Sequence, residues 1–332
     1  MRIGLGTGKI GTRRIGQEHI VLGFAVLLFL GYSIFLNGFV TPSNLVAIVR
    51  SVAVLGILAV GMGIVVIGRG IDLSMIAVMA MATAWQLELM NHGWSTPAAM
   101  GAVCLAVIVL GTVNGILIAY GDVPAIFATL ASGSFVFGFV RSQLITQDVV
   151  YVPKTADILL ALGQARVATL PIEVVFFALA VLVVFLALRF TKPGRFVYLM
   201  GDNYVAARTM GIPVRPMVVI QYVVSALLAW LAGLVTAAGL QSINTRIVNS
   251  TLLYDVILVV VIGGIGLSGG KGGMRNVVVG ALLIGIMLNG MTILDLPNIY
   301  QNLIKATILL AAIIVDSRLN PRDEQTAQQG DI

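Results

Sequence analysis

The stretch NLVAIVRSVAVLGILAVGMGIVVI, residues 44–67, holds a single charged residue, Arg50, in a run of otherwise uncharged and mostly apolar side chains. A helix needs about 20 mostly apolar residues to cross the hydrocarbon core of a bilayer, so this run is long enough to span it. The whole chain is similar: 59% of its 332 residues are hydrophobic, 10% are charged, and its mean hydropathy is +1.03. Soluble domains carry about 25% charged residues. The composition therefore indicates an integral membrane protein.

Further apolar runs, separated by turn residues, recur along the chain. We predict spans at 19–37, 44–67, 71–90, 98–119, 123–145, 171–190, 216–240, 252–268, 277–293 and 299–316. With the N-terminus inside, 14 of the 20 Lys and Arg residues fall in cytoplasmic segments, the bias that orients membrane proteins. We therefore expect an all-α polytopic membrane protein of about 10 transmembrane helices, with both termini inside and an inverted five-plus-five repeat.

No loop is long enough to fold alone, so we expect one transmembrane domain over 1–332, with a cytoplasmic loop at 191–215 and a cytoplasmic tail at 317–332. The first apolar run follows a basic stretch, MRIGLGTGKIGTRRIGQEH, which leaves two interpretations open. It is a retained first helix or a cleaved signal peptide. The length of the run and the lack of an A-x-A cleavage site favour the retained helix.

Several function classes are disfavoured by the residues present. One cysteine, Cys104, gives no disulfide framework, and two distant histidines, His19 and His92, make a transition-metal site an unfavoured interpretation. The net charge of +6 lies mostly in short loops and is no sign of nucleic-acid binding. The segment LSGGKGG, 267–273, fails the phosphate-loop pattern at both ends. We expect no catalytic activity, no bound cofactor and no metal in this chain.

The segment GRFVYLMGDNYVAARTMGIPVRP, residues 194–216, is polar although it lies between two long apolar runs. Asp202 is expected to cap a short helix that begins at Asn203. Gly211 can adopt the left-handed conformation after Met210, and Pro213 cannot continue the helix. A helix of about two turns is marginal in water without a packing partner. The residues leave two uses open, a helix lying on the membrane surface or a docking element for a soluble cytoplasmic protein.

Ionisable residues at membrane depth are costly, so each is a functional candidate. Asp72 lies near the predicted inner end of a span, where Arg69 could pair with it. Lys305 and Arg141 are expected to face the bundle interior, whereas Glu173 and Asp122 lie at span ends and are expected to be solvated. The uncharged polar residues within spans either hydrogen-bond a hydroxylated solute or join helices to each other, and they are Asn114, Gln143, Gln221 and Asn289.

Five stretches together carry a resemblance that covers nearly the whole chain. They are AVGMGIVVIGRGIDLS (59–74), NGILIAYGDVPAIFATL (114–130), GRFVYLMGDNYVAARTMGI (194–212), DVILVVVIGGIGLSGGKGG (255–273) and IKATILLAAIIVD (304–316). Their content and order resemble the ribose-type permeases of bacterial ABC importers. The resemblance implies a multi-pass subunit of the bacterial inner membrane that imports a monosaccharide, a polyol or a similar small polar solute by alternating access.

The same resemblance implies partners. These are a second permease subunit, identical or different, two cytoplasmic ABC ATPase domains that bind ATP and magnesium, and a periplasmic solute-binding protein. It also implies that the inner helix docks in a groove of the ATPase. The expected coupling residues are Asp202, Asn203, Tyr204, Val205, Ala206, Ala207, Arg208 and Gly211. The expected residues of the translocation pathway or its gate are Asp72, Ser74, Asn114, Phe127, Asp255 and Asn289.

The sequence departs from the family pattern at two places. Tyr204 and Val205 stand where acidic residues are common, which favours docking by apolar contact. Arg69 replaces a glycine that commonly precedes GIDLS. The alternative function is an ion-coupled secondary transporter of a small polar solute. An intramembrane enzyme is disfavoured, because it would need a metal or nucleophile cluster.

Overall fold

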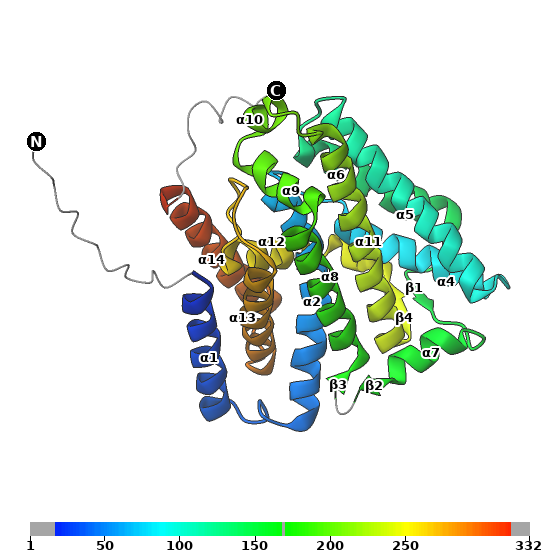
Figure 1. Cartoon of the computed structure of the whole chain (residues 1–332). Coiled ribbons are helices and arrows are strands. Elements are labelled where there is room, and N and C mark those ends of the chain that lie inside the picture. Colours follow the sequence, from blue (N-terminus) through cyan, green and yellow to red (C-terminus); the bar gives the residue numbers. More distant parts are fainter. Residues whose placement is uncertain (1–16, 168–169, 320–332) are drawn as a thin grey trace, which may run out of the picture.

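The computed structural model describes residues 17–167 and 170–319, which form a bundle of helices (Figure 1). The helical segments are α1 (Gln17–Phe35), α2 (Pro42–Ile67), α3 (Met75–Ala77), η1 (Val78–Ala82), α4 (Thr83–Asn91), α5 (Thr96–Ala119), α6 (Ala125–Phe139), η2 (Val140–Leu144), α7 (Asp157–Gln164), α8 (Ile172–Phe190), α9 (Lys192–Asp202), α10 (Tyr204–Thr209), α11 (Val214–Leu240), η3 (Thr245–Asn249), α12 (Leu252–Gly263), α13 (Met274–Ile293) and α14 (Asn298–Leu319). The strands are β1 (Val149–Tyr151), β2 (Arg166–Val167), β3 (Leu170–Pro171) and β4 (Ser242–Asn244).

Seven helices in the described part of the chain are long and apolar enough to cross a membrane. They are α1, α2, α5, the continuous α6–η2 segment, α8, α11 and α13, and each coincides with a predicted span. The other three predicted spans coincide with the segment α3–η1–α4, with α12 and with α14. The all-α polytopic membrane fold is therefore confirmed. The count of ten spans, their orientation and the inverted repeat stay predictions, and the basic N-terminal stretch and most of the predicted tail lie outside the described residues.

Helix α2 stands at the centre of the bundle. From Val52 to Ile67 nearly every residue is buried, including small residues such as Gly61 and Gly63. The main neighbours of α2 are α8, α11, α12 and α13, which all come from the second half of the chain. A helix that is apolar all round is expected in such a position, because it has no face to offer to water. The first described half and the second are thus joined around one buried helix.

Two predicted spans have different ends in the structure, for backbone reasons. The span predicted at 71–90 begins only at Met75, because residues 68–74 are not helical and Arg69 has a positive φ of 70°. The span predicted at 252–268 ends at Gly263, because Gly264 adopts the left-handed conformation with a φ of 101°. A left-handed glycine is a common helix terminus. In both places non-helical backbone therefore lies next to buried helices.

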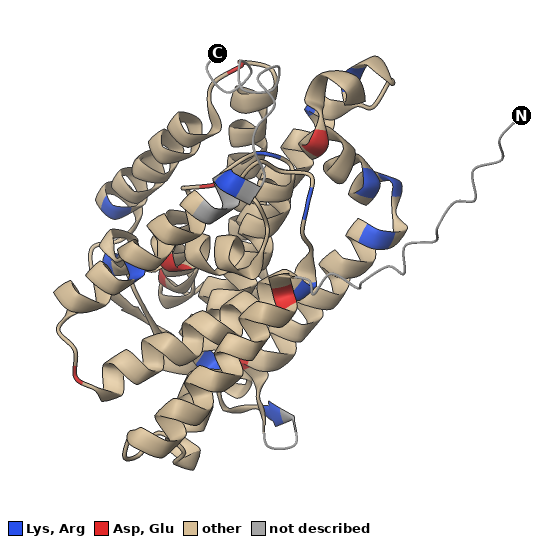
Figure 2. Cartoon of the chain, turned by 90° about the vertical axis from the view of Figure 1, so that its left-hand side faces the viewer, with Lys and Arg blue, Asp and Glu red and all other residues tan. Residues whose placement is uncertain are grey.

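The two ends of the bundle differ in character. One end carries α9 and α10, and the other carries α7 and the strands (Figure 1). There β1 pairs antiparallel with β4, with Val150 opposite Ile243. Long stretches of the helices are free of charged side chains, which gather at loops and helix ends (Figure 2). This distribution is expected of a chain whose middle lies in a bilayer.

Helices α5 and α11 approach each other closely because of two glycines. A Cβ atom on Gly111 would lie 2.7 Å from the Cα of Val223, and one on Gly115 would lie 2.5 Å from the Cα of Val219. Small residues allow such backbone contact between membrane helices. By contrast, a Cβ on Gly101, near the start of the same helix, would meet nothing within 4 Å.

We expect Gly115→Val to destabilise the protein by about 1–3 kcal/mol, because the added side chain overpacks the contact between α5 and α11. Gly101→Val introduces the same side chain into the same helix and should change stability much less. Thermal unfolding of the two purified variants in detergent compares them. Equal midpoints for both variants would show that the close contact does not limit stability.

Candidate functional site

Helix α10 is short and has a defined cap at each end. Asn203, and not Asp202 as predicted, is the N-terminal cap, and its side-chain oxygen accepts a hydrogen bond of 2.9 Å from the backbone N–H of Ala206. Asp202 is instead the last residue of α9, so the helix begins one residue later than expected. At the other end Gly211 has a φ of 79°, as predicted. The helix is therefore held in place by its sequence at both ends.

The two faces of α10 differ. Ala207 is fully buried in a small apolar cluster with Met200 of α9, Ile212 of the following loop and several side chains of α11. Tyr204 also packs against this cluster. The opposite face is open, with Val205 48% exposed and Met210 66% exposed, and Arg208 is exposed as well. The outward face is thus apolar with one positive charge, and the inward face anchors the helix to the bundle.

Helix α9 was missed in the sequence. It begins after Thr191, whose hydroxyl oxygen accepts a 3.2 Å hydrogen bond from the backbone N–H of Gly194, and Pro193 lies in its first turn. A capping threonine followed by proline is a helix-start signal that could have been recognised. The predicted loop at 191–215 therefore holds two short helices, with α9 placing α10 at its far end.

A second site is a buried polar cluster around the break between α2 and α3. Asp72 is 1% exposed, and its Oδ1 accepts hydrogen bonds from the backbone N–H and the hydroxyl of Ser74, at 3.0 and 2.5 Å. Its Oδ2 accepts one of 2.7 Å from the hydroxyl of Ser225 on α11. The side-chain amide of Asn114 on α5 donates to the hydroxyl of Ser74 at 3.2 Å. Three predicted pathway residues, Asp72, Ser74 and Asn114, are thus brought together.

Three further residues that were not singled out complete this cluster. Besides Ser225, Thr129 on α6 accepts a 3.0 Å hydrogen bond from the backbone N–H of Leu73. Tyr222 on α11 donates to the carbonyl oxygen of Ile71 at 3.3 Å. The sequence does not indicate which partner a single polar side chain in an apolar helix contacts, and for that reason these three residues were not predicted. The break between the helices is satisfied by side chains from three other helices, as buried backbone in a membrane requires.

The remaining predicted pathway residues lie elsewhere. The amide side chains of Asn289 on α13 and Asn44 on α2 exchange two hydrogen bonds, at 2.8 and 3.0 Å, so Asn289 joins two helices. Phe127 is 67% exposed on the surface of α6. Gln221 is buried beside the sulfur of Met200. The structure therefore favours the helix-joining interpretation for Asn289.

Asp255 forms an ion pair with Lys305 between α12 and α14. The Lys305 Nζ lies 2.9 Å from the Asp255 Oδ1 and donates a 2.8 Å hydrogen bond to the hydroxyl of Thr251. Both charged side chains are less than 10% exposed. Lys305 thus faces the bundle interior as predicted, and its partner is a predicted pathway residue 50 positions away.

Two other charged residues differ from expectation. Glu173 is buried and not solvated, and its carboxylate lies 3.2 Å from the Nε of Arg50 on α2. Arg141 lies beside β1 and pairs with Asp148 at 2.7 Å, away from the centre of the bundle. Asp122 is exposed, as predicted. In each buried case the partner comes from another helix, which lowers the cost of burying the charge.

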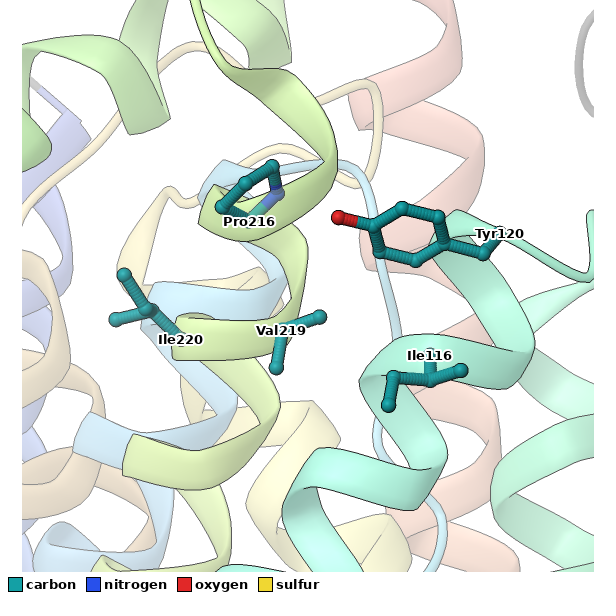
Figure 3. Close-up of a pocket in the computed structure, with 5 residues that line it drawn as sticks. All are labelled: Ile116, Tyr120, Pro216, Val219 and Ile220. Carbon is teal, nitrogen blue, oxygen red and sulfur yellow. The ribbon is translucent and has the colours of Figure 1, made fainter.

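An open apolar groove of about 610 Å³ lies between α5 and α11 (Figure 3). It is lined by Ile116, Tyr120, Pro216, Val219 and Ile220. It includes none of the predicted pathway residues, and the guanidinium of Arg215 lies over the ring of Tyr120, 5.2 Å from its centre. Among the described residues no group of three His, Cys, Asp or Glu could hold a metal ion.

Residues 44–313 match the family described as "Branched-chain amino acid transport system / permease component". The chain belongs to this permease family. The ribose import permease protein RbsC of Haemophilus influenzae is 30% identical over 319 residues, which cover 95% of this chain and 97% of that protein. RbsC of Escherichia coli K12 is 32% identical over 281 residues, or 84% and 87% of the two chains. The galactofuranose transporter permease protein YtfT of the same strain is 34% identical over 271 residues, or 82% and 79%.

No solved structure matches the chain. The curated relatives confirm the resemblance to ribose-type permeases of ABC importers, and with it a multi-pass location in the bacterial inner membrane. The matched family is one of transport permease subunits and not of enzymes.

We expect Lys305→Met to destabilise the permease by about 3–5 kcal/mol, because it leaves the Asp255 carboxylate buried without its partner. The double variant Asp255→Leu with Lys305→Met removes both charges and should recover most of this loss. Thermal unfolding of the purified proteins measures both. A single variant as stable as the parent protein would contradict the assignment of a buried pair.

Proposed function

We propose that this permease is the membrane subunit of an ABC importer that carries a monosaccharide, a polyol or a similar small polar solute inward. The observation that carries the proposal is α10, a capped helix whose buried Ala207 anchors it to the bundle while Val205, Arg208 and Met210 remain exposed. The names of the curated relatives, which refer to ribose and galactofuranose, support the solute class.

In this proposal α10 docks in a groove of a cytoplasmic ABC ATPase, one of two in the complete importer. The ATPases bind ATP and magnesium, and their closure displaces α10 toward or away from the bundle. An isolated helix of six residues is not stable in water, so its anchoring by α9 and α11 is what makes it usable as a docking element. A second permease subunit, identical or different, and a periplasmic solute-binding protein complete the importer.

Transport itself is alternating access without covalent chemistry on the solute. We place the gate at the Asp72 cluster, where hydroxyl and amide groups converge from the break between α2 and α3 and from α5 and α11. Such groups exchange hydrogen bonds readily with a hydroxylated solute. Because the binding protein supplies most of the affinity, the pathway needs only a few weak contacts, and a transient cavity is sufficient.

The alternative is an ion-coupled secondary transporter, and it makes a different prediction for energy coupling. Uptake of radiolabelled ribose, arabinose and ribitol is measured in vesicles that contain the permease and are supplied with its solute-binding protein, with and without the ATPase, before and after an uncoupler. We expect uptake of at least one of these solutes to require the ATPase and ATP and to persist with the uncoupler. Uptake that survives loss of the ATPase and collapses with the uncoupler would establish the alternative.

We expect Gly211→Pro and Arg208→Glu each to abolish ATP-dependent uptake while leaving membrane insertion intact. Proline fixes φ near about −65° and cannot adopt the positive φ that Gly211 has, so the connection from α10 to α11 would be displaced. Glutamate at 208 reverses the only charge on the exposed face of α10 in the described helix.

Arg318→Glu is the matched control for the charge reversal, because Arg318 is also exposed and lies in the last turn of another helix, α14. It should retain uptake. Copurification of the ATPase with each variant separates lost docking from lost transmission. Normal uptake in both α10 variants would refute the coupling assignment.

A further inference from the structure

Three backbone segments that are far apart in the sequence meet next to α10. They are the end of α2 at Ile67, the end of α9 at Gly201, and the glycine-rich loop 267–273 at Gly270. The backbone N–H of Gly270 donates a 2.8 Å hydrogen bond to the carbonyl oxygen of Ile67. A Cβ atom on Gly201 would overlap that same oxygen and would lie 2.6 Å from the nitrogen of Gly270. The three main chains therefore touch without side chains between them.

The loop is shaped for this contact. Gly269, Gly270 and Gly272 have φ angles of 81°, 71° and 97°, a conformation that side chains disfavour. A Cβ on Gly270 would also lie 2.8 Å from the Cα and backbone nitrogen of Asp202, the residue before the cap of α10. The run of glycines, which fails the phosphate-loop pattern, thus has a structural reason in this backbone contact.

Helix α9 holds the loop at a second point. The hydroxyl of Tyr198 donates a 2.9 Å hydrogen bond to the carbonyl oxygen of Gly272. Burial raises the pKa of Tyr198 above its ordinary value, so its hydroxyl stays protonated and able to donate at neutral pH. Tyr198 and Asp202 are four residues apart on α9 and so lie on one face of it. The loop and the last turn of α9 are therefore expected to move together.

The segment that follows Ile67 connects this backbone contact to the Asp72 cluster. Ile67 is the last residue of α2, and the break that follows packs tightly against α11, because a Cβ on Gly68 would overlap the side chain of Gln221. Five residues after Ile67, Asp72 is hydrogen-bonded to Ser225. A displacement of the Ile67 carbonyl group is therefore expected to move the Asp72 carboxylate, which is only five residues further along the chain.

We propose that loop 267–273 is a positioning strut that transmits movement of α9 and α10 to the Asp72 cluster, through the backbone contacts of Gly201, Gly270 and Ile67. The proposal rests on the proposed function, because it names how the docked helix acts on the gate. Backbone segments in direct contact move together, because a closely packed interior transmits the displacement of one segment to the next, whereas flexible side chains between them would absorb it. It also gives the loop between α12 and α13 a part in coupling, in addition to the covalent links of α10 to α9 and α11.

The test follows the gate directly, with the complete permease–ATPase complex in nanodiscs. Cys104 is replaced by Ala, and Leu73→Cys places a thiol beside Asp72. The rate of maleimide labelling at position 73 is measured without nucleotide and with ATP and vanadate, and ATP hydrolysis is measured in parallel. We expect Gly201→Ala and Gly270→Ala to reduce the nucleotide-dependent change in labelling at least about fivefold, the low end of typical coupling between sites, while the ATPase still copurifies and hydrolyses ATP.

Gly138→Ala is the matched control, because a Cβ there meets nothing within 4 Å, and it should label as the parent complex does. Tyr198→Phe keeps the ring and removes only the hydrogen bond to Gly272, so it tests the strut even where the glycine variants fold poorly. We expect it to weaken the change by about two- to tenfold, the effect of one lost hydrogen bond.

The outcomes separate the two proposals. A parent complex that shows no nucleotide-dependent labelling, or no ATPase that copurifies, would refute the proposed function. A normal response in the parent together with an unaltered response in Tyr198→Phe and in the folded glycine variants would refute the strut and leave the proposed function standing.

Discussion

The buried carboxylate of Asp72 sets the main constraint on this structure. A carboxylate inside a membrane bundle is tolerated only where donors surround it, and its donors here come from Ser74 and from Ser225 on α11. Asn114 on α5 extends the cluster through Ser74. These bonds require α5 and α11 to lie close together, and Gly111 and Gly115, on either side of Asn114, remove the side chains that would hold them apart. The polar cluster and the apolar packing of the bundle therefore depend on each other.

The break between α2 and α3 has the same origin. Non-helical backbone at membrane depth must be satisfied by its neighbours, and here Thr129 and Tyr222 bond the segment next to Asp72. The helical segment that begins at Met75 directs the positive end of its dipole toward the carboxylate, and the N–H of Ser74 bonds it directly. The buried connection between two spans thus creates both the need for a polar partner and the place for one. This supports the proposal of a gate at this segment, because its bonds can be exchanged without breaking a helix.

Some of this could be predicted from the sequence and some could not, for identifiable reasons. Long apolar runs locate helices well, because about 20 apolar residues have few other uses. The predicted ends of these helices are wrong where the local backbone conformation ends the helix, as at Gly264 and at the break before Met75. The cap of α10 was placed one residue early because Asp202 and Asn203 are both good caps, and only packing chooses between them. The partners of Glu173 and Lys305 were missed because they lie on other helices, far away in the chain.

Tyr204 and Val205, the two positions where the resemblance predicts acidic residues, have different surroundings. Tyr204 packs inward against the cluster that holds Ala207, so an acid there would lose apolar contact and gain nothing from a partner outside. Val205 faces outward and lies three residues before Arg208, the spacing at which an acid would pair with the arginine within the helix. With valine there, the charge of Arg208 is available to the docking partner that we propose. We infer that the groove that receives α10 is apolar opposite Val205 and Met210 and places a carboxylate opposite Arg208, so specificity for this permease lies in one charge on an apolar surface.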